Sequence, residues 1–119
     1  ILEGDGNLLM NLGSLPMVGS LQPGNFLHIV LDNEVYASTG NQPTISNAVE
    51  LEELAKSARY AYVRKVTTNE DLKTEMIHTL KNEDPSFLLV KIVDTEEERE
   101  IGRVTHSPEQ IKDKFMSAM

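Results

Sequence analysis

Two continuous apolar runs constrain the fold of this chain more than any other feature of its sequence. Residues 26–31 (Phe-Leu-His-Ile-Val-Leu) and 87–93 (Phe-Leu-Leu-Val-Lys-Ile-Val) have the length and the β-branched content of strands that are buried on both faces. A shorter strand is predicted over residues 61–66, and segments of helical character separate the strands. Strands that alternate with helices form parallel sheets with right-handed crossovers. The sequence therefore predicts an α/β fold in three layers, with helices on both faces of a parallel sheet.

The segments between the strands predict four helices. Residues 8–21 carry apolar side chains nearly all round a helix, which indicates burial on most sides, and Pro16 predicts a kink. Ser46 or Asn47 would cap a helix that reaches residue 58, and Thr68 would cap one that reaches residue 81. The last helix starts at residues 107–108, a Ser-Pro cap followed by Gln. The methionines at helical core positions are assigned to packing: Met10, Met17 and Met76.

Residues 33–46 show no sustained periodicity and predict a loop of about fourteen residues, a length that is usually functional. The histidines and the acidic run are interpreted as structural or surface features and not as parts of a site. His28 lies within an apolar run and is predicted to be a hydrogen-bonded core residue, whereas His78 and His106 are predicted at the surface. The acidic run at 94–100 is predicted to be a solvated loop.

The bulk composition bounds the class of protein. A chain of 119 residues suits a single domain, and no apolar run reaches the roughly 18 residues of a membrane helix, so we expect a soluble protein. The net charge of −8 disfavours nucleic acid as a partner. The absence of cysteine excludes disulfides and thiolate metal sites and fits the cytoplasm. Because the chain starts at Ile1 without a signal peptide, we expect it to be part of something longer.

Polar motifs follow two of the predicted strands. Gly4-Asp5-Gly6 follows the first strand and Asp32-Asn33 follows the second, so both lie at the carboxyl edge of the sheet, where such sheets bind ligands. Asn33 comes 28 positions after Asp5, the span of one strand end, one helix and one return strand. Carboxylate and amide oxygens suit Mg²⁺. The glycines allow a close approach of the backbone to an anion, and a helix that starts near Asn7 would direct its free N–H groups there.

The combination of these motifs resembles the two-part motif of the thiamine-diphosphate enzymes. Residues 31–36 (Leu-Asp-Asn-Glu-Val-Tyr) and 38–44 (Ser-Thr-Gly-Asn-Gln-Pro-Thr) are similar to the narrower group of phosphonopyruvate and sulfopyruvate decarboxylases, and the resemblance runs through the last helix. It implies a thiamine-diphosphate-binding fold in which residues 1–119 are the diphosphate-binding domain without its N-terminal part. This chain departs from the family pattern at Glu34, which follows Asn33 and brings a charge close to the site.

The resemblance also implies roles for individual residues. Asp5 and Asn33 would bind Mg²⁺ through their side chains and Val35 through its backbone carbonyl. The cofactor-binding residues would be Gly4, Asp5, Gly6, Asn7, Asn33, Val35 and Tyr36. The loop at 38–44 would lie over the cofactor, where its hydroxyl and amide groups could meet a substrate anion. No residue of this chain is assigned as catalytic, because in such enzymes the activating glutamate lies on a separate pyrimidine-binding domain.

The activity implied is the decarboxylation of an anionic 2-oxo acid, with phosphonopyruvate decarboxylase as the leading assignment and the sulfopyruvate decarboxylase beta chain as the alternative. A second alternative is a non-catalytic diphosphate-binding module. We expect a partner domain or subunit that supplies the pyrimidine-binding half, a homo- or hetero-oligomer, and no activity from the chain alone. A partial sheet would also expose an edge or an apolar face.

Overall fold

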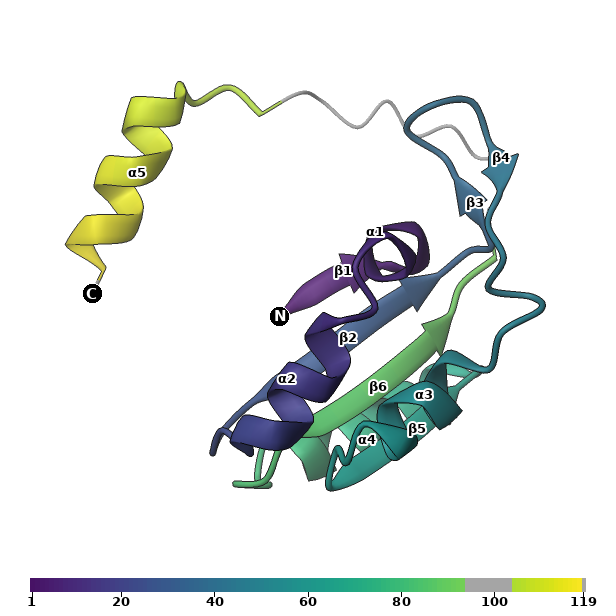
Figure 1. Cartoon of the computed structure of the whole chain (residues 1–119). Coiled ribbons are helices and arrows are strands. Elements are labelled where there is room, and N and C mark those ends of the chain that lie inside the picture. Colours follow the sequence, from purple (N-terminus) through teal and green to yellow (C-terminus); the bar gives the residue numbers. More distant parts are fainter. Residues whose placement is uncertain (94–103, 119) are drawn as a thin grey trace.

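The computed structural model describes residues 1–93 and 104–118 (Figure 1). Its main sheet contains β1 (Leu2–Gly4), β2 (Leu27–Asp32), β5 (Tyr62–Val66) and β6 (Ser86–Lys91). The order across the sheet is β1-β2-β6-β5, and every pair is parallel. The predicted α/β class and parallel sheet are confirmed.

Helices cover the two faces of this sheet. The helices α1 (Asp5–Met10), α2 (Ser14–Leu21) and α3 (Leu51–Ser57) pack on one face around a core that includes Leu8, Leu15 and Phe87. Helix α4 (Asn69–Thr79) packs against β5 and lies behind the sheet in Figure 1. The three-layer arrangement predicted from the alternation of strands and helices is therefore present.

The predicted helix over residues 8–21 is wrong in two respects. The structure has two helices in this region, because Asn11 leaves the helical conformation (φ −145°, ψ 58°). Pro16 lies in the first turn of α2, where a backbone N–H has no partner within the helix, so the proline does not kink it. Burial on most sides is also wrong, since Met10 is 72% and Met17 66% exposed. Because they are exposed, Met10 and Met17 do not pack in the core, whereas Met76 is half-buried.

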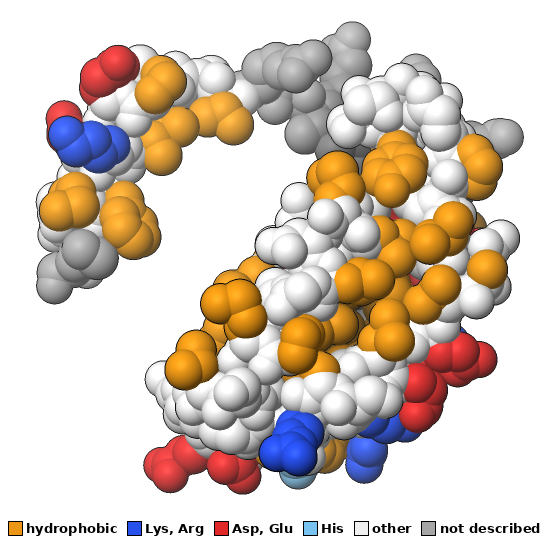
Figure 2. All heavy atoms as spheres, in the orientation of Figure 1, with side chains coloured by type: hydrophobic (Ala, Val, Ile, Leu, Met, Phe, Trp, Pro, Cys, Tyr) orange, Lys and Arg blue, Asp and Glu red, His pale blue; other side chains and the backbone are white. Residues whose placement is uncertain are grey.

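Apolar side chains gather on the face of the molecule seen in Figure 2. Large exposed apolar residues of the helices on this side of the sheet include Met10 of α1 and Met17 and Leu21 of α2. Strand β1 is also an edge strand of the described sheet. The expectation of an exposed edge and an apolar face is thus met in the described part of the chain.

The later helices follow their predicted caps with one exception. Thr68 caps α4 by accepting from the Asp71 N–H, and Ser107 with Gln110 forms a capping box at α5 (Pro108–Ser117), whose residues are all exposed. Helix α3, however, starts five residues after Ser46. The Ser46 hydroxyl bonds to other side chains near the sheet, so it is not available as a helix cap.

The segment predicted as an irregular loop contains a small hairpin. Strands β3 (Val35–Tyr36) and β4 (Gln42–Pro43) pair antiparallel, and Gly40 and Asn41 supply the positive φ angles of 127° and 58° at the turn. This hairpin stands at the carboxyl edge of the main sheet in Figure 1. The acidic run at 94–100 lies outside the described residues. Among the described helices, none has both the length and the apolar character required to cross a membrane.

Candidate functional site

The register of the sheet sets the two motifs side by side. Gly4 pairs with Leu31 and Asp32 pairs with Lys91, so the chain leaves β1 and β2 at the same edge. A cavity of about 400 Å³ opens at this edge. The seven residues predicted to bind a cofactor all line it: Gly4, Asp5, Gly6, Asn7, Asn33, Val35 and Tyr36. The structure therefore brings the predicted residues together, while their roles stay predictions.

Asp5 is the first residue of α1, and only 1% of it is exposed. A buried carboxylate is costly unless hydrogen bonds or a cation compensate its charge. Its Oδ2 atom accepts a hydrogen bond from the Thr44 hydroxyl at 2.5 Å. No other described side chain donates to Asp5, so the Oδ1 atom is available to a ligand. Helix α1 also begins at this residue, two positions earlier than predicted.

Asp32 has a different role from the neighbouring Asn33. Its Oδ1 atom accepts from the Glu34 N–H at 3.1 Å and from the Ser46 hydroxyl at 2.9 Å, and its Oδ2 atom accepts from Lys91 Nζ at 2.9 Å. Both oxygens are therefore occupied by the protein. Asp32 anchors the motif and does not line the cavity, whereas half-buried Asn33 does.

The turn after β2 has an uncommon backbone. Glu34 has φ +63°, in the left-handed region that favours glycine. The Asn33 side-chain oxygen accepts from the Val35 N–H at 3.2 Å, and the Glu34 carbonyl accepts from the Thr44 N–H at 2.8 Å. The backbone geometry at Glu34, which the family resemblance did not define, is thus held by hydrogen bonds on both sides.

A buried network that sequence reasoning missed joins the two motif aspartates. The Thr44 hydroxyl donates to Asp5, the Ser46 hydroxyl donates to Asp32, and the two hydroxyl oxygens lie 3.0 Å apart. The family resemblance implies that Thr44 lies over the cofactor with the rest of its loop. Its hydroxyl instead points to the buried Asp5 carboxylate. Lys91 completes the network. A lysine inside an otherwise apolar run is the sequence signal that could have indicated it.

Lys91 pairs with both carboxylates of the turn. Its Nζ atom donates to Asp32 and also to the carboxylate of Glu34. Burial alone would lower the pKa of Lys91, but the hydrogen bonds to Glu34 and Asp32 outweigh it and raise the pKa above its usual value. The ammonium therefore stays charged at neutral pH and neutralises part of the negative charge beside the cavity.

The glycine at position 6 is required by its contact with Tyr36. A Cβ atom on Gly6 would lie 2.4 Å from Cε1 of the Tyr36 ring, so a side chain there would displace the ring. The N–H groups of Gly6 and Asn7 lie in the first turn of α1, where backbone donors have no partner within the helix. The Asn7 side chain, in contrast, donates to Glu3.

His28 is a satisfied core residue, as predicted. Only 4% of it is exposed, its Nε2 atom lies 2.5 Å from Glu3 Oε1, and its Nδ1 atom lies 3.0 Å from the Tyr60 hydroxyl. Burial lowers the pKa of His28, although the Glu3 carboxylate acts in the opposite direction. Burial and Glu3 together raise the pKa of Tyr60 to about 12. His78 and His106 are exposed, as predicted.

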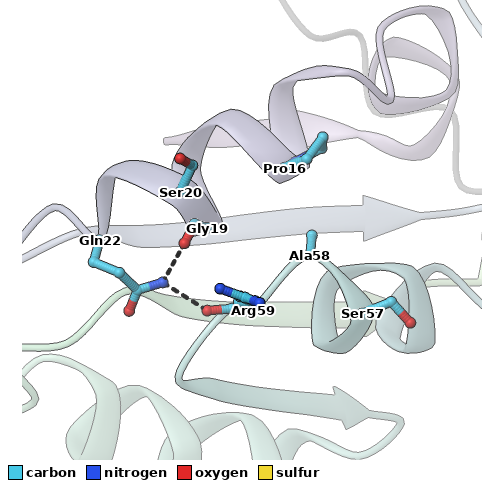
Figure 3. Close-up of a pocket in the computed structure, with 7 residues that line it drawn as sticks. All are labelled: Pro16, Gly19, Ser20, Gln22, Ser57, Ala58 and Arg59. Atoms are coloured by element: carbon cyan, nitrogen blue, oxygen red, sulfur yellow. Dashed lines mark hydrogen bonds between the residues drawn. The ribbon is translucent and has the colours of Figure 1, made fainter.

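A second hollow, of about 490 Å³, lies between α2 and α3 and does not include the predicted residues (Figure 3). Gln22 Nε2 bridges its two sides by donating to the Gly19 carbonyl at 2.6 Å and to the Arg59 carbonyl at 2.7 Å. A Cβ on Gly19 would lie 1.4 Å from the Ala58 carbonyl oxygen. This hollow therefore lies at the packing contact between two helices, and the candidate site is the cavity at the sheet edge.

Comparisons with known proteins show the family to which the chain is related. Residues 1–90 match the family described as thiamine pyrophosphate enzyme, C-terminal TPP binding domain. The chain is 41% identical over 92 residues to a phosphonopyruvate decarboxylase of Streptomyces viridochromogenes, which covers 77% of this chain and 23% of the relative. It is 33% identical over 122 residues to the sulfopyruvate decarboxylase subunit beta of Methanocaldococcus jannaschii, which covers 100% of this chain and 62% of that subunit.

The chain thus spans less than two thirds of the length of these curated relatives. The family match nevertheless includes both motifs, the sheet apart from Lys91, and the cavity lining apart from Ile92. This chain belongs to the thiamine pyrophosphate enzyme family, as a C-terminal TPP-binding domain.

Proposed function

We propose that the cavity at the sheet edge binds the diphosphate of thiamine diphosphate together with Mg²⁺. Asp5 and Asn33 would bind the metal through side-chain oxygens, and Val35 through its backbone carbonyl. These are three hard oxygen donors, the kind that Mg²⁺ prefers while it keeps further positions for water and phosphate. The observation that carries the proposal is the buried Asp5 carboxylate at the cavity wall, with one oxygen held by Thr44 and the other open to a ligand.

The donor set fits the surroundings of the cavity. The part of the chain that the structure describes has no cluster of three or more His, Cys, Asp or Glu residues arranged for a metal. A site with a single carboxylate gains the rest of its negative charge from the diphosphate, so this result agrees with a metal that binds along with the cofactor. The N–H groups of Gly6 and Asn7 would meet the diphosphate, with Tyr36 beside it.

We further propose that the chain is a component of an enzyme that decarboxylates an anionic 2-oxo acid. The bound cofactor supplies an electron sink for the loss of CO₂, and the protein binds and orients it. The cavity contains one carboxylate, Asp5, and no glutamate among its described lining residues. The glutamate that activates such cofactors would therefore come from a pyrimidine-binding domain or a partner subunit, and the assembly would be an oligomer.

Identity alone does not separate the two substrate assignments, since a phosphonopyruvate decarboxylase is 41% identical over 92 residues and a sulfopyruvate decarboxylase beta subunit is 41% identical over 64 residues. Coverage favours sulfopyruvate, because the match to the beta subunit extends over the whole chain, including the last helix, at 33% identity. We give more weight to coverage and propose the sulfopyruvate type, with phosphonopyruvate as the second candidate.

Binding is tested by calorimetric titration of thiamine diphosphate into the 119-residue chain, with and without Mg²⁺. Asp5→Asn keeps an acceptor for Thr44 but removes the charge, so it should weaken Mg²⁺-dependent binding by at least about 100-fold. Asp113→Asn, an exposed residue on α5, is the matched control and should bind as the wild type does. Equal affinity of the Asp5→Asn variant, or binding that does not depend on Mg²⁺, would contradict the proposed site.

Activity is tested on the native assembly purified through this chain. Release of CO₂ from sulfopyruvate in preference to phosphonopyruvate is the expected result, and the reverse preference selects the second candidate. An assembly that binds the cofactor and turns over neither acid would instead support a non-catalytic diphosphate-binding module.

A further inference from the structure

Lys91 occupies an unusual position at the end of a buried strand. Residues 86–90 of β6 are all buried, and Lys91 follows them at the carboxyl edge, directly opposite Asp32 in the neighbouring strand. Its ammonium contacts two carboxylates, those of Asp32 and Glu34. These are the residues on either side of Asn33, a proposed metal ligand.

The turn that holds Asn33 carries two separate sources of instability. Glu34 takes a left-handed φ of +63°, a conformation that glycine adopts far more readily. Its carboxylate also lies close enough to Asp32 for both to share one ammonium, so the two negative charges would repel one another without Lys91. Among the described residues, Lys91 is the cation that pairs with either of them.

The same turn positions the two proposed metal ligands that follow β2, the Asn33 side chain and the Val35 carbonyl. The Glu34 N–H bonds to Asp32, and the Asn33 side-chain oxygen bonds to the Val35 N–H. A displacement of Glu34 therefore moves both the Asn33 amide and the Val35 carbonyl. The turn is tied to the hairpin by one further bond, from the Thr44 N–H to the Glu34 carbonyl.

We propose that Lys91 is a positioning residue for the metal site: by holding Asp32 and Glu34 together, it keeps Asn33 and Val35 in the arrangement needed to bind the ion. The proposal rests on the proposed function for the identity of the ion. Lys91 itself does not line the cavity that would hold the cofactor. It acts through the carboxylates on either side of Asn33.

The chain offers a matched control on the neighbouring strand. Lys65 of β5 pairs with Glu52, a buried residue of α3, at 2.9 Å. Lys65 and Lys91 also line one hollow, which is separate from the candidate cavity. Lys65→Met thus removes a comparable ion pair with a buried carboxylate but leaves the turn after β2 intact. Lys91→Arg keeps the positive charge and serves as the conservative variant.

The first measurement needs no ligand. Residue-resolved amide hydrogen exchange of the metal-free chain reports the Glu34 and Thr44 N–H groups, with the amides between β2 and β6 as an internal reference. Lys91→Met should speed exchange at these two amides by at least about 10-fold relative to the reference, and Lys65→Met should not. Unchanged exchange in Lys91→Met, or an equal change in Lys65→Met, would overturn the proposal.

The second measurement is a Mg²⁺ titration in the presence of thiamine diphosphate. Lys91→Met should weaken Mg²⁺ binding by about 10-fold or more, as expected for the loss of a group that orients a metal ligand, while Lys91→Arg and Lys65→Met should stay within about 3-fold of the wild type. In a Glu34→Gly background the strained residue and one carboxylate are gone, so the loss caused by Lys91→Met should shrink below about 3-fold.

The two measurements separate the two proposals. If the wild-type chain binds Mg²⁺ and Lys91→Met binds it equally well, the positioning role of Lys91 is overturned and the cofactor site stands. If neither the wild-type chain nor the native assembly purified through it binds Mg²⁺ with thiamine diphosphate, the proposed function is overturned, and the exchange data alone decide whether Lys91 holds the turn.

Discussion

The hydrogen bond between Thr44 and Asp5 makes a quantitative prediction about stability. Thr44 is 4% and Asp5 1% exposed, and their oxygen atoms lie 2.5 Å apart, so neither group can exchange its partner for water. A hydrogen bond to a charged group contributes about 1.5–3 kcal/mol. Thr44→Val keeps the shape of the side chain and leaves the buried carboxylate without its described side-chain donor. We expect the free energy of unfolding to fall by about 2–3 kcal/mol.

The assay is urea unfolding followed by circular dichroism, in a chelating buffer at neutral pH. Thr39→Val is the control: its hydroxyl also donates to a side chain, Gln42 at 2.8 Å, but both residues are exposed, so the change should stay within about 0.5 kcal/mol. Thr44→Ser retains the hydroxyl and should lose only about 1 kcal/mol for the missing methyl group. A Thr44→Val variant as stable as the wild type, or no more destabilised than Thr44→Ser, would refute this account of the network.

Three further predictions concern packing, pH and activity. Gly19→Ala would place a Cβ 1.4 Å from the Ala58 carbonyl oxygen and should lower the free energy of unfolding by about 1–3 kcal/mol. Gly13 has a helical φ of −61°, and a Cβ there would make only an ordinary contact with the Asn11 side-chain oxygen at 3.7 Å, so Gly13→Ala should raise the free energy of unfolding by up to about 1 kcal/mol in the same urea assay. Because burial lowers the pKa of His28 below its ordinary value of 6.5, the unfolded chain takes up that proton first as the pH falls through 6.5. Stability should therefore decline below that pH, and His28→Gln should show a smaller decline; parallel pH profiles for the two proteins would contradict this. The purified 119-residue chain should release no CO₂ from either 2-oxo acid, and measurable release without a partner would show that it carries its own activating group.

The sequence was sufficient to predict the parallel sheet and the meeting of the two motifs at one edge of it. Buried parallel strands are read from continuous apolar runs, and residues that end adjacent strands are brought to one edge by topology alone. Asp5 and Asn33 could therefore be placed together before the structure was known. The capping pattern at Ser107 was equally local, since it depends on residues within one turn of a helix.

The parts that could not be predicted depend on long-range contacts. Ser46 satisfies a local rule for a helix cap, but its hydroxyl bonds to Asp32, which only the folded sheet brings near. Thr44 reaches Asp5 across 39 positions of sequence. Met10 and Met17 obey helical periodicity, yet the periodicity of an apolar stripe cannot say which side of a helix meets the sheet. Each error therefore arose where tertiary contacts overrode a local preference.

The tip and the base of the β3–β4 hairpin make different contacts, and this difference determines which part of the segment can be exchanged between relatives. Its tip, residues 39–42, is exposed and bonds mainly to itself. Its base carries Thr44 and Ser46, which bond the aspartates of both motifs. Residues 39–42 do not line the cavity, so a chimaera that replaces the tip alone should leave the residues of the candidate site assembled. One that also replaces Thr44 and Ser46 removes the link between the two motifs.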